Sequence, residues 1–172
     1  MLFRSSNSII DFAISHDKTK AATVGIDNLL VLWDLKTMRE LFECRGHNNW
    51  VISVDFSPND LWLVTTSWDK TVIVWNAQTG EKVNVYSDIS EYAESAVFFN
   101  DSQRVLLFGS ARGNDEVTIF DGFSGRTLKK YEGHFAIRAK CDSFLIVGND
   151  YEGAIYSINI YTDEIKYLFF LP

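Results

Sequence analysis

Residues 46–76, which read GHNNWVISVDFSPNDLWLVTTSWDKTVIVWN, decide the fold of this chain. The stretch contains three runs rich in Val, Ile, Leu and Phe, separated by short polar segments. The first polar segment, Ser57-Pro58-Asn59-Asp60, suits a type I turn, because proline presets φ at its second position. The second is Ser67-Trp68-Asp69-Lys70, again between apolar runs. The pattern predicts strands joined by tight turns.

The same pattern occurs four times along the 172 residues, at 9–43, 51–86, 93–131 and 135–170. The third run of each segment ends in an acid or amide after an apolar residue, at Trp33-Asp34, Trp75-Asn76, Phe120-Asp121 and Ile158-Asn159. These ends are spaced 42, 45 and 38 residues apart. A period of this size is typical of repeat architectures. Because no stretch has a useful helical period, the sequence predicts an all-β chain forming a single domain over residues 1–172.

Turn residues support the same division into segments. The last turns of the second and third segments contain Gly80 and Gly125. Glycine is the residue expected where the backbone needs a positive φ. We therefore expect positive φ at both glycines.

Composition excludes several classes of protein. The chain is 47% hydrophobic and 15% aromatic, which excludes intrinsic disorder. Sixteen basic against 23 acidic residues give a net charge of −7, which argues against direct binding of duplex nucleic acid. No segment reaches the roughly 18 apolar residues of a membrane span. Cys44 and Cys141 lack CxxC spacing, so we expect reduced thiols in an intracellular protein, either cytoplasmic or nuclear.

The stretch quoted above resembles the WD40-repeat family through Gly46-His47, Ser67-Trp68-Asp69 and Val74-Trp75-Asn76. The resemblance implies a β-propeller with four blades of four antiparallel strands, either a half-propeller or a fragment of a larger ring. In this family a His, a Ser or Thr on the second strand, a turn Asp and the Trp form a buried hydrogen-bonded network. By resemblance, that network here comprises His47, Ser67, Asp69 and Trp75.

The other three repeats depart from this pattern. The first keeps Asp27 and Trp33, but it has Gly25 where the second has Ser67, and no His precedes Ile9. The third has Phe120 in place of the Trp, and the fourth has Gly133-His134 but Ile158 in place of the Trp. We expect Asp27 and Trp33 to take the corresponding structural positions in the first blade.

No motif indicates catalysis, a cofactor or a metal site. His47 and His134 lie 87 residues apart without companion ligands, which favours structural histidines. Ser67 and Lys70 match a short S-x-x-K pattern, but that motif needs a serine on a helix, and this one lies in a turn between strands. A propeller enzyme would need polar groups converging on the channel, and the inner strands offer mainly Asp11, Ser53, Asp55 and Ser95.

Trp50 and Trp68, with Asn48 beside them, are the candidate partner-binding residues. In propellers that this chain resembles, both Trp positions tend to face the wider rim around the channel, where partners bind. Tryptophan anchors dominate the energies of many interfaces. The alternative is that both indoles pack against neighbouring loops.

The number of blades bears on the partners. Each blade of a propeller buries both sheet faces, so four blades that do not close would expose two apolar faces. The chain is then part of a longer protein, pairs with itself or another propeller fragment through the open blades, or closes as a ring of four. We predict a non-catalytic scaffold or adaptor for protein–protein interaction in a larger assembly. The alternatives are a ribonucleoprotein subunit that contacts RNA mainly through other proteins, and a propeller-type enzyme.

Overall fold

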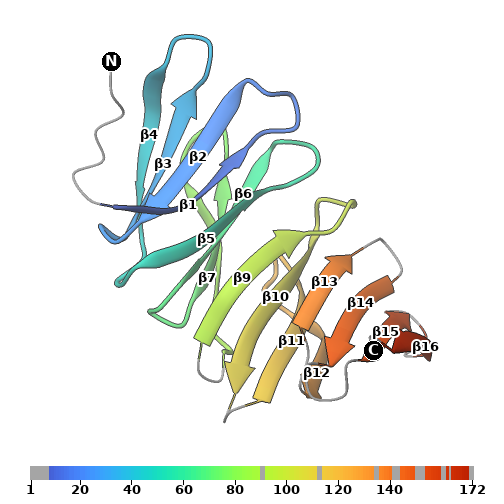
Figure 1. Cartoon of the computed structure of the whole chain (residues 1–172). Helices are drawn as coiled ribbons and strands as arrows, with labels where there is room; N and C mark the ends of the chain where they lie inside the picture. The colour runs from blue at the N-terminus through green and yellow to red at the C-terminus, as the bar shows by residue number, and fades with distance from the viewer. Residues whose placement is uncertain are drawn as a thin grey trace.

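The structure, a computed structural model, is all-β (Figure 1). It describes residues 8–89, 92–111, 114–133, 136–140, 144–149, 154–159, 162 and 164–170. Within these residues the chain forms strands β1 to β16 and no helix. The strands form four antiparallel sheets of four strands each. The predicted fold class, four blades of four antiparallel strands, is confirmed.

Each sheet is a meander in which consecutive strands pair. The first sheet contains β1 (Ile9–Ile14), β2 (Lys20–Gly25), β3 (Leu29–Asp34) and β4 (Arg39–Arg45). The second contains β5 (Val51–Phe56), β6 (Trp62–Ser67), β7 (Val72–Asn76) and β8 (Lys82–Tyr86). The third contains β9 (Tyr92–Phe98), β10 (Arg104–Ala111), β11 (Asn114–Asp121) and β12 (Thr127–Gly133). The fourth contains β13 (Ala136–Lys140), β14 (Phe144–Asn149), β15 (Ala154–Asn159) and β16 (Ile165–Phe170).

Position within a sheet determines how apolar a strand is. β6 and β7 are buried along nearly their whole length, because neighbouring sheets cover both of their faces. A strand covered on both faces has a continuous apolar run rather than an alternating one. β8 lies at the sheet edge, and most of its residues are exposed. In the second blade, the continuous apolar runs therefore mark the two middle strands.

The tight turns repeat from blade to blade with the same backbone conformation. The predicted positive φ is confirmed at Gly80 and Gly125, with values of 72° and 70°. Met38 occupies the corresponding turn of the first blade with a φ of 56°. A side chain in this left-handed region costs roughly 1–2 kcal/mol. The first blade therefore contains a strained turn where the next two use glycine.

Apolar clusters join successive sheets into an arc. In Figure 1 the four sheets follow one another, and β1, β5 and β9 lie side by side. One cluster joins the first and second sheets, and it includes Leu30, Leu32, Phe56 and Trp75. A second cluster joins the second and third sheets, and it includes Val74, Tyr86, Phe98 and Phe120. The second sheet is thus held on both faces.

Carboxylates on β1 and β5 add polar contacts between neighbouring blades. The Asp11 carboxylate accepts a hydrogen bond of 3.0 Å from the backbone N–H of Val54. The Asp55 carboxylate accepts one of 3.0 Å from the backbone N–H of Phe98. Each bond links the inner strand of one blade to the inner strand of the next. These acidic residues hold the blades in register.

Candidate functional site

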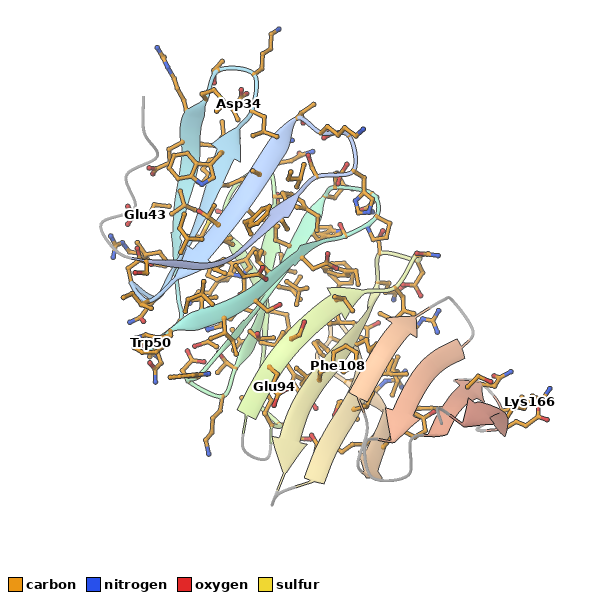
Figure 2. The ribbon with its side chains drawn as sticks, in the orientation of Figure 1. Asp34, Glu43, Trp50, Glu94, Phe108 and Lys166 are labelled. Carbon is orange, nitrogen blue, oxygen red and sulfur yellow. The ribbon has the colours of Figure 1, made fainter. Side chains whose placement is uncertain are left out.

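Two tryptophans are stacked on each other at the surface of the second blade. The ring centroids of Trp50 and Trp68 are 4.7 Å apart, and their planes are inclined by 24°. Trp50 is 41% exposed and Trp68 is 47% exposed, although both side chains are large and apolar. Figure 2 labels Trp50 next to the start of β5. Water therefore reaches much of an aromatic surface that other protein could cover.

Strand register brings the two indoles together. Trp50 directly precedes β5 and Trp68 directly follows β6. These strands are antiparallel, and their last paired residues are Val51 and Ser67. The backbone N–H of Trp68 extends the pairing by donating a 3.0 Å hydrogen bond to the carbonyl of Trp50. The two residues are thus opposite neighbours, as cross-strand pairs are.

A buried hydrogen-bonded network lies within the same blade and is centred on His47. The Nε2 atom of His47 is 2.7 Å from the hydroxyl of Thr65. Its Nδ1 atom is 3.1 Å from a carboxylate oxygen of Asp69 and 3.0 Å from the hydroxyl of Thr71. The indole N–H of Trp75 donates a 2.9 Å hydrogen bond to the Thr65 hydroxyl. Thr65 therefore joins the imidazole to the indole.

The partners in this network assign the protons. The Thr71 hydroxyl donates its proton to the Asp69 carboxylate over 2.6 Å, so it has none to give to Nδ1 of His47. Nδ1 therefore carries the proton that is donated to Asp69. The Nε2 atom is then the acceptor, and Thr65 donates to it. Thr65 can still accept from Trp75, because a hydroxyl donates once and accepts twice. A neutral imidazole satisfies every group.

The hydroxyl that lies between His47 and Trp75 belongs to Thr65, whereas the sequence predicted Ser67 as the hydroxyl residue of the network. Ser67 ends β6, two residues further along. Its hydroxyl instead donates to the carbonyl of Asn49 over 3.1 Å and accepts from the backbone N–H of Asp69 over 3.0 Å. Residues two apart share a face of the sheet but differ in position by about 7 Å along the strand. Ser67 therefore braces the turn, and only Thr65 bridges His47 and Trp75.

Asp69 connects the buried network to the loop that carries the tryptophans. The carboxylate oxygen that faces His47 also accepts a 2.7 Å hydrogen bond from the backbone N–H of Asn48. The other oxygen accepts from the backbone N–H of Thr71 over 2.9 Å. One carboxylate therefore fixes both the segment before Trp50 and the turn after Trp68. Asn48 itself is exposed, two residues before Trp50.

Burial and hydrogen bonding set the charges of the two titratable groups. Burial lowers the pKa of His47 and outweighs the attraction of Asp69, so the imidazole is neutral near pH 7. Burial acts to raise the pKa of Asp69, but hydrogen bonds from Thr71 and Asn48, with the nearby His47, hold that pKa below its usual value. Asp69 is therefore ionised and accepts four donors. These charges agree with the proton assignment above.

The first blade contains a shorter version of the network. The indole N–H of Trp33 donates a 2.9 Å hydrogen bond to the hydroxyl of Thr23. Thr23 precedes Gly25 by two residues, just as Thr65 precedes Ser67. Asp27 accepts a 3.4 Å hydrogen bond from the backbone N–H of Leu29, the first residue of β3. The recurrence of Thr at this position is the signal by which the sequence could have identified Thr65.

The polar groups considered for catalysis and metal binding have structural partners. Asp11 and Asp55 bind backbone N–H groups of the following blade, and the Ser53 and Ser95 hydroxyls are 3.2 Å apart. Across the described residues, no three His, Cys, Asp or Glu side chains gather as a metal site would require. His134 lies outside the described residues. The part of the chain that the structure describes also has no helix able to cross a bilayer.

Comparison with known proteins identifies the repeat. The family described as "WD domain, G-beta repeat" matches residues 38–76, which include the whole His47 network. The chain is a WD40-repeat protein. Repeats of this family generally serve as scaffolds for protein interaction.

Relatives and solved structures agree with this family. The WD40 chain is 33% identical to "Protein HIR1" of Cryptococcus neoformans over 91 residues, which are 53% of the chain and 10% of that protein. It is 33% identical to "Eukaryotic translation initiation factor 3 subunit I" of Coccidioides immitis over 120 residues, 69% of the chain and 34% of that protein. "Structure of U3-55K" matches with a TM-score of 0.82 at 14% identity, covering 96% of the chain and 53% of the solved chain.

The WD40 chain is short beside these proteins. It spans between a tenth and about a third of the two curated relatives and about half of the solved propeller. At 14% identity, the solved structure shows the fold alone. It establishes that the arc of sheets is WD40 propeller architecture, as the resemblance in the sequence predicts.

Proposed function

We propose that this chain is a non-catalytic scaffold, a subunit of a larger assembly, that binds a protein partner through Asn48, Trp50 and Trp68. These three residues are called the tryptophan rim below. The observation that carries the proposal is the stacked, exposed pair of indoles on a rigid loop. Tryptophan is enriched among residues that dominate binding energy, because it buries a large rigid surface at low entropic cost.

Preorganisation supports the proposal. The exposed indoles stack on each other, and backbone hydrogen bonds at Trp68 and Asn48 fix the loops that carry them. A partner therefore does not have to order these loops when it binds. An apolar side chain placed against the open indole faces would gain most of the binding energy. A rim that served only the fold would bury the indoles against the chain itself.

The alternatives have less support. A propeller enzyme needs free polar groups in the channel, whereas Asp11 and Asp55 bind backbone amides of neighbouring blades. A ribonucleoprotein subunit remains compatible with a scaffold, provided that it contacts RNA through other proteins, since the chain carries a net charge of −7. We place the scaffold inside the cell, in the cytoplasm or the nucleus. The cysteines support this placement, because Cys44 is a buried free thiol and neither Cys44 nor Cys141 has the spacing of a disulfide framework.

Quantitative capture from native lysate tests the rim. The chain, the Trp50→Ala/Trp68→Ala double variant and a Leu61→Ala control are immobilised at equal density. Leu61 is exposed on the same blade, at 41%, but lies in the turn before β6. We expect at least one protein to be captured by the chain and the control but lost from the double variant. That protein, once purified, should bind the double variant at least about tenfold more weakly, which corresponds to about 1.4 kcal/mol.

The result that contradicts the proposal is equally specific. If every captured protein binds the double variant as well as the chain, the tryptophan rim is not the docking surface. Thermal unfolding of the double variant serves as the folding control. Both indoles are about half exposed, so their removal should leave the fold nearly as stable as before.

A further inference from the structure

The tryptophan rim presents aromatic surface on the sides of the two indoles that face away from each other. Because the rings of Trp50 and Trp68 are stacked with their centroids 4.7 Å apart, each ring covers the inner face of the other. The exposed surface of both residues therefore comes mainly from the outer faces and the ring edges. Two rings form a short apolar surface rather than the continuous stripe that an amphipathic helix needs.

The hydrogen-bond acceptors around the two rings are occupied. The Asp69 carboxylate accepts four hydrogen bonds, which fills the lone-pair sites of both oxygens. The carbonyl of Trp50 accepts the backbone N–H of Trp68. Asn49 accepts the backbone N–H of Trp50 with its side-chain oxygen and the Ser67 hydroxyl with its carbonyl. A ligand that brings hydrogen-bond donors therefore finds few acceptors here.

The donors at the rim, by contrast, are open to a ligand. Among the described residues, the indole N–H groups of Trp50 and Trp68 have no hydrogen-bond acceptor. Asn48 is exposed, and its side-chain amide can also donate. Lys70 is exposed in the turn that follows Trp68, and its ammonium group adds further donors. The rim therefore combines apolar rings with an excess of hydrogen-bond donors.

We propose that the tryptophan rim binds a proline-rich segment of its protein partner in the polyproline II conformation, a step that rests on the scaffold function proposed above. The apolar proline rings pack on the outer indole faces. Proline has no backbone N–H, so such a segment brings carbonyl acceptors and almost no donors. The polyproline II helix has no internal hydrogen bonds, which leaves its carbonyls available to the indole N–H groups. The segment is already ordered before it binds, so little entropy is lost.

A cationic segment is the alternative that the local charges disfavour. Lys and Arg pack on tryptophan faces, and the chain has a net charge of −7. However, Lys70 is exposed two residues after Trp68 and repels a second cation. The Asp69 carboxylate, which could otherwise bind a guanidinium group, is filled by donors of its own blade. The rim therefore suits a neutral ligand rich in acceptors better than a basic one.

Calorimetric titration with octaproline, acetylated and amidated at its ends, tests the proposal. The full chain should bind this peptide with a dissociation constant below about 1 mM, and Trp50→Ala/Trp68→Ala should bind it at least about tenfold more weakly. Trp68→Phe keeps an aromatic ring but loses the indole N–H, so it should bind about two- to tenfold more weakly. Leu61→Ala, the exposed control on the same blade, should bind as the chain does. A Gly-Ser peptide of equal length, which has N–H groups and no rings, should not bind.

Several results would overturn the proposal. They are absence of binding by the chain at about 1 mM octaproline, equal binding by the double variant, and tighter, tryptophan-dependent binding of octa-arginine, which would make the rim a cation site. Octaproline should also displace any protein whose capture from lysate depends on the two tryptophans, and failure to displace it contradicts the proposal. Tryptophan-dependent capture without octaproline binding refutes the proline-rich ligand alone. Octaproline binding without tryptophan-dependent capture refutes the scaffold proposal instead.

Discussion

Replacing Thr65 with Val removes the hydroxyl at the centre of the buried network and little else. Val and Thr have nearly the same shape, and both are branched at Cβ, so strand β6 keeps its packing and its β propensity. Two groups lose their partner, the indole N–H of Trp75 and Nε2 of His47. Both residues are buried, and no solvent reaches these atoms to replace the hydroxyl.

The expected cost follows from those two groups. Leaving one buried polar group unsatisfied costs roughly 1–3 kcal/mol. The two losses share one site and are not additive, so we expect Thr65→Val to lower the free energy of unfolding by about 2–4 kcal/mol. Thr66→Val is the matched control, because Thr66 is the next residue, is equally buried, and makes one long hydrogen bond of 3.4 Å to the carbonyl of Glu94. It should cost less than about 1 kcal/mol.

Urea unfolding at pH 7, followed by tryptophan fluorescence, measures both variants. The midpoint should fall while the slope of free energy against urea stays unchanged, since the folded surface is the same. If Thr65→Val is as stable as the parent, or no less stable than Thr66→Val, the proposed central role of this hydroxyl is wrong. Ser67→Ala measured in parallel separates the two hydroxyls, because the hydrogen bonds of the Ser67 hydroxyl go to Asn49 and Asp69 instead.

Three further perturbations test the network and the turns. Folding lowers the pKa of His47, so the unfolded chain binds the proton more readily than the folded chain does. The free energy of unfolding should therefore fall as the pH drops below about 6.5. His47→Gln should flatten this dependence in urea titrations from pH 7.5 to 5. Asp69→Ala should lower stability by about 1–3 kcal/mol through the unpaired imidazole and the freed Asn48 amide, and thermal unfolding equal to the parent would contradict the assignment. Gly80→Ala should lower the free energy of unfolding by about 1–2 kcal/mol, since φ is 72° and a Cβ there would lie 3.0 Å from Phe42 Cβ. Met38→Gly in the corresponding turn should not lower it measurably.

The repeat and its turns could be predicted from sequence because local chemistry fixes them. Gly80 and Gly125 mark turns that need positive φ, and the structure has positive φ at both. The apolar runs mark strands buried on both faces, such as β6 and β7. The turn at Met38 could not be predicted in this way, because it contains no glycine. Its turn has the same conformation without the glycine, because the strands on either side impose it.

The site could be predicted only in part, since strand register decides which hydroxyl faces which partner. His47, Asp69 and Trp75 could be named from the motif, but Thr65 and Ser67 lie on the same face of β6 and carry similar hydroxyls. Only the pairing of β6 with β7 places Thr65 beside the Trp75 indole. The stacking of Trp50 on Trp68 likewise depends on the pairing of β5 with β6. Their exposure, which makes the rim a binding candidate, is a property of the assembled blade.

The buried network and the proposed binding surface of the tryptophan rim share one carboxylate, that of Asp69, on the most regular repeat. Asp69 binds His47 in the interior and the amide of Asn48 at the surface with the same oxygen atom. The loop before Trp50 can therefore shift only if the carboxylate loses a charge-assisted hydrogen bond, which is roughly twice as strong as a neutral one. In the first blade, no His precedes β1, and Asp27 accepts a hydrogen bond from the backbone N–H of Leu29, two residues further along the chain. A partner that needs two indoles in a fixed geometry would find them on the second blade, where the buried network holds the segment before Trp50 in place.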